Sequence, residues 1–115
     1  MKILLPVDGS AYTKRMLAWL TTNEEWLSGA HQFTVLTVTP AIPPHVASVF
    51  SAEDIKGYFD DCSETVFKPI RKFLAKHDLA TRYEAKVGHA PEVIAKTADK
   101  GKFDLVVMGS HGHGN

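Results

Sequence analysis

Apolar positions along the 115-residue chain gather in short runs separated by longer periodic segments. The run at residues 2–7 is nearly unbroken, as is typical of a strand buried on both faces of a parallel sheet. Residues 33–39 are rich in β-branched side chains, which favour strands. Residues 82–87 alternate polar and apolar side chains, which indicates a half-buried strand nearer a sheet edge. With the final apolar run at 104–108, the pattern predicts four strands.

Helical spacing fills the segments between these strands. Ser10 can cap a first helix over residues 11–27, where apolar side chains recur at roughly one helical turn. Ser51 and Asp54 form a capping-box-like start for a long second helix. Its apolar stripe follows steps of four and three residues and consists of Ile55, Phe59, Cys62, Val66, Ile70 and Phe73. By spacing, the core also includes Trp19 and Trp26.

Prolines and glycines mark where elements begin and end. The three prolines of "PAIPPH", residues 40–45, predict a loop after the second strand. Pro69 lies inside the second helix and should kink it or lift one turn. Pro91 suits the first turn of a third helix over residues 91–100, which Gly101 can terminate.

Strands and helices thus alternate along the chain, and parallel strands need crossover connections. This order predicts an α/β fold with a doubly wound parallel sheet. A length of 115 residues with 44% hydrophobic and 23% charged residues fits one domain with a substantial core. No repeat or linker divides it.

Charge and cysteine content limit the function. Thirteen basic residues balance thirteen acidic ones, so no net charge draws the chain toward nucleic acid or an acidic membrane. The single Cys62 cannot form an internal disulfide, and the first residues lack a signal-peptide pattern. No apolar run approaches the ~20 residues that span a bilayer. We expect a cytoplasmic protein that binds neither nucleic acid nor membranes.

Two loops follow the carboxyl ends of predicted strands, where ligands bind in open parallel sheets. One is "DGS", residues 8–10, and the other is "GSHGHG", residues 109–114. Gly109 and Gly112 lack side chains, so backbone N–H groups can converge on an anion. The spacing matches neither a dinucleotide fingerprint nor a Walker loop. The residues alone leave a phosphate site and a plain flexible loop both open.

Three stretches together resemble the universal stress protein family over nearly the whole chain: "ILLPVDGS" at 3–10, "LTVTP" at 36–40 and "DLVVMGSHGHG" at 104–114. The resemblance implies a Rossmann-like sheet with strand order 3-2-1-4-5. It also implies a site for ATP, as in the nucleotide-binding branch of the family, and a homodimer for the full-length protein.

The resemblance further implies which residues contact the nucleotide. Asp8 would meet the ribose or the adenine edge, and Pro6 and Val38 would line the adenine. Met108 and the glycines after it would lie near the ribose and phosphates. The complete set is Pro6, Val7, Asp8, Ser10, Val38, Met108, Gly109, His111 and Gly112.

The family's phosphate signature is Gly, two residues, Gly, nine residues, Gly, and then Ser or Thr. Gly109 and Gly112 match its first half, and the given sequence ends three residues later. We therefore expect residues 1–115 to be a single universal stress protein domain truncated at its C-terminal side. The fifth strand and last helix, about 25 residues, would be missing.

Other interpretations of these residues are less well supported. Asp8 could accept a phosphoryl group, but residues 2–7 offer no acidic neighbour to help hold a metal. His89, His111 and His113 could form a histidine-only metal site, although no Cys or carboxylate partner accompanies them in the sequence. We predict no protein-held metal, only an optional magnesium ion on the ATP phosphates. Cys62 lies on an apolar stripe and is interpreted as core packing.

Two functions from different classes follow. The first is an ATP-binding stress-response protein that acts as a sensor or regulator and not as a fast enzyme, since no set of nucleophile, base and oxyanion donors is apparent. The second is a dimeric scaffold of the same fold without nucleotide. A Gly-Ser or Gly-Thr pair nine residues beyond Gly112 would favour the first.

Overall fold

The computed structural model describes residues 1–23, 31–76 and 81–108. The strands in these ranges are β1 (Lys2–Pro6), β2 (Gln32–Thr39), β3 (Thr81–Val87) and β4 (Leu105–Val106). The helices are α1 (Ala11–Thr22), α3 (Pro44–Ala47), α4 (Ala52–Ala75) and α5 (Ala90–Lys100). The alternation of strands and helices agrees with the order expected from the hydrophobic pattern.

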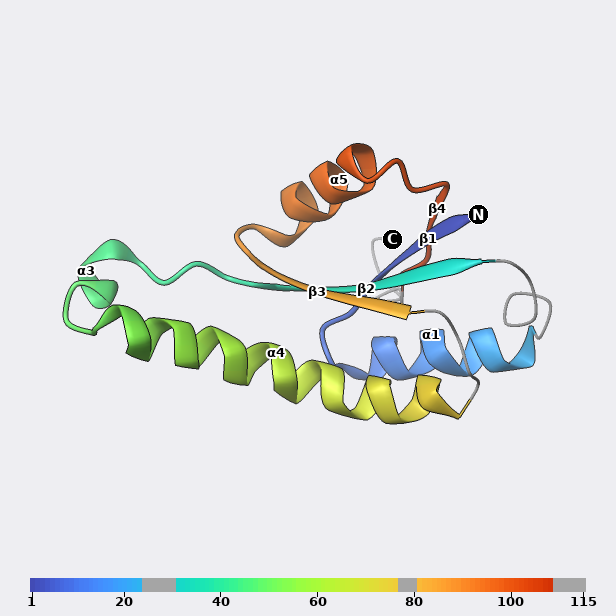
Figure 1. The fold of residues 1–115 in the computed structure, drawn as a ribbon, viewed down its shortest axis with the longest axis horizontal. Helices are drawn as coiled ribbons and strands as arrows, with labels where there is room; N and C mark the ends of the chain where they lie inside the picture. The colour runs from blue at the N-terminus through green and yellow to red at the C-terminus, as the bar shows by residue number, and fades with distance from the viewer. Residues whose placement is uncertain (24–30, 77–80, 109–115) are drawn as a thin grey trace.

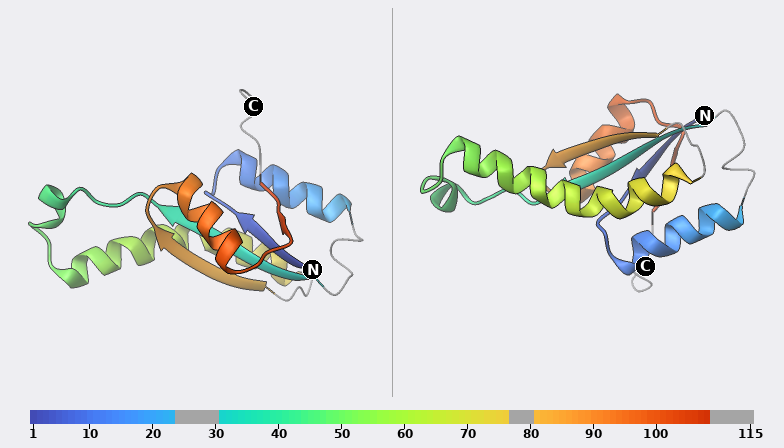
Figure 2. Two further views of the ribbon diagram at one scale, coloured as in Figure 1. Left: turned by 90° about the horizontal axis from the view of Figure 1, so that it is seen from above. Right: turned by 60° about the horizontal axis from the view of Figure 1, so that its bottom comes forward.

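The four strands form one parallel sheet in the order β3-β2-β1-β4, as predicted. Pro6 at the end of β1 lies opposite Leu36 of β2, and Leu4 lies opposite Val106 of β4. Helices α1 and α4 cover one face of the sheet and α5 covers the other (Figure 1), and the turned views agree (Figure 2). The fold is therefore a doubly wound, Rossmann-like α/β arrangement.

Alternation along β1 and β2 divides their side chains between two layers. Ile3, Leu5 and Val7 belong to the core cluster with Phe33 and Val35 of β2 and with α1 and α4. Side chains of opposite parity point to the other face of the sheet, because successive residues of a strand alternate. Pro6 and Leu36 therefore belong to the α5 side.

Side-chain caps begin both helices that cover the core. Ser10 Oγ accepts a hydrogen bond from the Tyr12 amide at 3.2 Å, which caps α1 as predicted. At α4, Ser51 Oγ accepts from the Asp54 amide at 3.0 Å, and the Asp54 carboxylate accepts from the Ser51 amide at 3.4 Å. This reciprocal pair is the predicted capping box.

Two predicted element boundaries were wrong. The strand expected over residues 104–108 is regular only at Leu105–Val106, which pair with β1. Beyond these two residues, the Asp104 and Val107 amides each donate a single hydrogen bond to β1, so regular pairing does not continue. The "PAIPPH" segment is not all loop, because α3 begins at Pro44. A proline is suited to the first helical position, where its missing N–H has no intrahelical partner in any case.

Three predicted core side chains lie elsewhere. Phe59 is half-buried on the first half of α4 and lies outside the core cluster. Trp19 is 45% exposed, because it lies on the outer side of α1. Cys62 is half-buried and lies outside the core cluster. Helix α4 continues through Pro69. Trp26 and the end of the predicted first helix fall outside the described residues.

Candidate functional site

The turn after β1 is held by Asp8 and Thr13. Asp8 Oδ1 accepts from the Ser10 amide at 2.9 Å and from the Thr13 hydroxyl at 3.1 Å. The same hydroxyl accepts from the Asp8 amide at 3.1 Å. Gly9, between them, has φ +79°, a conformation that is strained for residues with a side chain. The sequence "DGS" thus fixes an exposed carboxylate at the carboxyl end of β1.

A cavity of about 530 Å³ opens beside this turn, on the α5 side of the sheet. Its floor comes from the ends of the strands, with Pro6 of β1, Leu36 and Val38 of β2, and Val106 of β4. These residues share one face because of their register and parity. The volume lies within the range of about 300–1,000 Å³ that is usual for small-molecule pockets.

Helix α5 forms the opposite wall, which the sequence did not lead us to predict. Its contribution is a stripe at helical spacing that consists of Ala90, Pro91, Ile94, Ala95 and Ala98. Most of these side chains are small, so the helix leaves space above the sheet. The spacing was visible in the sequence, but its closeness to the end of β1 depends on the crossover from β3 to β4. Tyr12 and Thr13 of α1 also line the cavity.

The structure brings five of the nine predicted nucleotide residues together around this cavity. They are Pro6, Val7, Asp8, Val38 and Met108. Ser10 serves as the cap of α1 and is not part of the cavity wall. Gly109, His111 and Gly112 lie outside the described residues, so the contacts of the glycine-rich loop stay a prediction.

The cavity is mostly apolar, with one acidic edge. Among the described residues that line it, Asp8 is the only aspartate or glutamate, and none is Lys, Arg or His. Within the described ranges, no group of three or more His, Cys, Asp or Glu side chains could hold a metal ion. His89 is exposed at the start of α5, with Nδ1 3.9 Å from Glu92 Oε1. The arrangement can hold a flat apolar group and offer it one carboxylate acceptor.

The described helices were also considered as membrane spans. None of those within residues 1–23, 31–76 and 81–108 has both the length and the apolar character needed to cross a bilayer. The longest, α4, carries charged residues along its whole length.

Comparison with known proteins identifies the fold and the family. The model of the universal stress protein family matches residues 1–115. Universal stress protein Slr1230 of Synechocystis sp. (strain ATCC 27184 / PCC 6803 / Kazusa) is 27% identical over 112 residues, which is 97% of this chain. The match covers 33% of Slr1230, so the chain spans about a third of the length of this curated relative.

Solved structures share the same architecture. Hypothetical protein MJ0577 superposes with a TM-score of 0.76 at 25% identity, over 99% of this chain and 77% of that one. A universal stress protein family protein from Arabidopsis thaliana, At3g01520, described with AMP bound, has a TM-score of 0.74 at 17% identity and is covered to 80%. A universal stress protein in complex with cAMP has a TM-score of 0.72 at 14% identity and the same coverage.

Proposed function

The chain belongs to the universal stress protein family, and from this premise we propose that it binds an adenine nucleotide, ATP, in the cavity between the strand ends and α5. The observation that carries the proposal is the combination of an apolar slot with a single carboxylate at the carboxyl ends of β1 and β2. Ligands of open parallel sheets bind at this edge. Residues 1–115 would form one domain of the family and act in the stress response as a sensor or regulator.

The base would occupy the apolar part of the cavity. Pro6 and Val38 from the sheet, and Ile94 from α5, offer opposite apolar surfaces between which a flat ring can lie. Asp8 is a hydrogen-bond acceptor at the rim, suited to ribose hydroxyls or to the adenine amino group. Two similar folds are described with AMP and cAMP bound, and both ligands carry this same adenosine part.

The phosphates would extend past Met108 to the glycine-rich segment that begins at Gly109. Met108, the last described residue, lines the cavity and is 56% exposed. The described lining residues supply no cation for the phosphates, and backbone N–H groups of the segment 109–112 would take that role. A magnesium ion would be held mainly by the phosphates themselves, since Mg²⁺ needs few protein ligands.

We also propose that turnover of the bound nucleotide is slow. No Lys, Arg or His lies among the described residues of the cavity wall, so none of them can stabilise negative charge developing on a phosphoryl group. Asp8 Oδ1 is already engaged by the Ser10 amide and the Thr13 hydroxyl. Steady-state hydrolysis should stay far below the ~10 s⁻¹ that is typical of enzymes.

Isothermal titration with MgATP, AMP and GTP tests the proposal. We expect both adenine nucleotides to bind and GTP to bind at least about tenfold more weakly, because one apolar slot cannot satisfy the additional polar groups of guanine. Gly109→Val should abolish ATP binding by placing a side chain against the ribose and phosphates. Binding of ATP with unchanged affinity to that variant would contradict the proposed position of the phosphates.

Gly57→Ala provides the matched control for that substitution. A Cβ added at Gly57 meets nothing within 4 Å, and the residue lies in α4, away from the cavity. ATP affinity should therefore be unchanged. Failure of the wild-type chain to bind any adenine nucleotide would favour the second function, a scaffold without nucleotide.

A further inference from the structure

A projecting arm, defined here as residues 40–62, extends beyond the end of the sheet. It consists of the segment after β2, the short helix α3 and the first half of α4 (Figure 1). No residue of the arm is buried, whereas the second half of α4 contributes Phe67, Ile70 and Leu74 to the core. A 24-residue helix thus uses only its second half to cover the sheet.

Large apolar side chains are nevertheless concentrated on the arm. Val46, Phe50 and Tyr58 are 38%, 52% and 51% exposed. Together with Ile42 and Ile55 they line a groove of about 720 Å³ between the α3 segment and α4. An apolar surface of this kind, rimmed by polar residues, is typical of an interaction site.

The polar rim of the groove is acidic. The arm carries Glu53, Asp54, Asp60 and Asp61 against the single Lys56, a net charge of −3 with His45 neutral. Asp54 lines the groove, and Asp61 follows Tyr58 by three residues, which places both on one side of the helix. Lys56 is itself paired with Asp60, with Nζ 2.6 Å from Oδ2.

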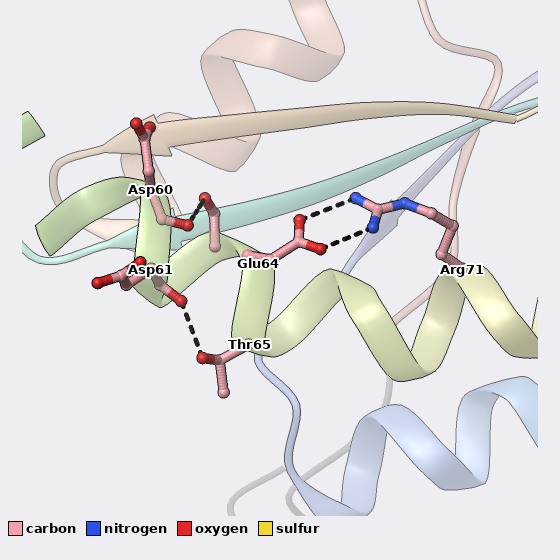
Figure 3. A network of polar contacts seen from close by, with 6 residues as sticks. Asp60, Asp61, Glu64, Thr65 and Arg71 are labelled. Carbon is pink, nitrogen blue, oxygen red and sulfur yellow. Dashed lines mark hydrogen bonds and ion pairs between the residues drawn. The ribbon is translucent and has the colours of Figure 1, made fainter. Parts of the chain in front are cut away.

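Charge along α4 changes sign where the arm ends. Residues 65–76 carry four basic side chains and no acidic one. Glu64 joins the two parts by a two-pronged ion pair with Arg71, at 2.8 and 3.1 Å (Figure 3). The arrangement lowers the pKa of Glu64 through its hydrogen bonds with Arg71. Along α4, the excess of acidic charge is therefore confined to the arm.

We propose that the arm groove binds a basic amphipathic helix of a partner protein. Such a segment places apolar anchors in an apolar groove at helical spacing, and its flanking Lys and Arg side chains then face the acidic rim. The groove is apolar and its rim is negatively charged. A helix with apolar side chains on one face and basic side chains beside them complements both the groove and the rim. The inference is independent of nucleotide binding.

A second copy of the chain fits the groove less well. Pairing two arms would bring two acidic surfaces together, which costs free energy. The basic half of α4 in another copy has the right charge, but its apolar residues Phe67, Ile70 and Leu74 are buried in its own core. It therefore has no comparable set of anchors to place between Phe50 and Tyr58.

The probe for this site is a synthetic helical peptide of about 18 residues, long enough to form a helix. Leucines recur on one face at steps of three and four, and lysines and arginines fill the other. An otherwise identical peptide with glutamate in place of each basic residue is the charge control. We expect the basic peptide to bind the full 115-residue chain in fluorescence anisotropy, more weakly as salt increases, and the acidic peptide not to bind.

Matched variants locate the binding. Phe50→Ser should lower the affinity for the basic peptide by about tenfold or more, because a central apolar contact in the groove is lost. Trp19→Ser, which removes a similarly exposed aromatic ring from α1, should leave affinity unchanged. Asp61→Asn should weaken binding about threefold and reduce its salt dependence, whereas Asp99→Asn on α5 should have no effect.

Circular dichroism of each variant confirms that the fold is intact. Equal peptide affinity for wild type, Phe50→Ser and Asp61→Asn would overturn the proposal, and so would equal affinity for the basic and acidic peptides. Sedimentation of the free chain tests the other occupant. A concentration-dependent dimer that Phe50→Ser abolishes and the basic peptide cannot displace would assign the groove to a second copy instead.

Discussion

The cavity at the strand ends and the groove on the arm are both apolar hollows, yet they are supported in opposite ways. Residues that form the cavity floor lie on β1, β2 and β4, and the side chains beside them on β1 are buried in the core. The arm groove is lined by half-buried and exposed side chains, beyond the part of α4 that covers the sheet. A site on rigid strands can hold a small ligand in one position, while a groove on an exposed arm suits a larger and more adaptable partner.

The largest difference between the two regions should appear in stability. Phe33→Ala removes a ring that is 1% exposed at the centre of the core and should lower the free energy of unfolding by about 3–5 kcal/mol. Phe50→Ala, on the arm, should change it by less than about 0.5 kcal/mol. Urea denaturation measures both. A similar loss in the two variants would show that the arm is part of the cooperative core.

The next largest difference should be in ligand binding, because a change at the cavity should affect ATP and leave the peptide unaffected. Asp8→Asn preserves Oδ1 as an acceptor for the turn but removes the negative charge at the cavity rim. ATP affinity should fall about tenfold, which is the contribution expected of a charged hydrogen bond. Affinity for the basic peptide at the arm should not change. If the variant loses both ATP binding and peptide binding in titrations, the substitution has disturbed the turn and the fold, and the lost charge is not the cause.

The two serine caps allow a closer comparison. Ser10→Ala and Ser51→Ala should each destabilise the protein by about 1 kcal/mol, since each removes a side-chain acceptor at a helix start. Only Ser10→Ala should also weaken ATP binding, because the family resemblance implies that Ser10 contacts the nucleotide. Thermal denaturation and calorimetric titration of the pair measure the two effects. Unchanged ATP affinity in Ser10→Ala would leave Ser10 with a capping role alone.

The smallest effect concerns the pH dependence at the base of the arm. Arg71 holds the pKa of Glu64 below its ordinary value of 4.5. The ion pair therefore stabilises the folded state at pH values above 4.5. It is lost as the pH falls through the lowered pKa in the folded state. Both side chains are exposed, so the change should be slight. Melting temperatures of wild type and Glu64→Gln should differ slightly near neutral pH and converge in acid.

Much of the fold could be predicted from the sequence because its signals are local. Continuous apolar runs, the Ser10 cap and the Ser51 capping box are properties of neighbouring residues, and all appear in the structure. The strand order followed from the family resemblance and is confirmed. The exposure of Trp19 and the half-burial of Cys62 could not be predicted, because helical spacing alone does not show which side of a helix, or which part of its length, packs on the sheet.

The candidate site was predictable on one side only. Pro6 ends β1, and Asp8 lies in the recognisable turn that follows it. Val38 lies near the end of β2, and Met108 follows β4 by two residues. The α5 wall, with Ile94 and its neighbouring alanines, depends on a crossover connection that brings a distant helix over the sheet. Similarly, the arm groove depends on where α3 turns back toward α4.

Filling the cavity from the α5 side tests the central claim most directly. Ala95 is an exposed residue whose side chain lines the cavity, so Ala95→Phe should occupy the proposed adenine slot with little effect on stability. Ala75→Phe, at the exposed end of α4, is the control. We expect calorimetric titration to show that Ala95→Phe lowers the affinity for ATP by about a hundredfold or more, while the control binds ATP as tightly as wild type. Equal ATP affinity for wild type and a folded Ala95→Phe variant would contradict the assignment of this cavity as the nucleotide site.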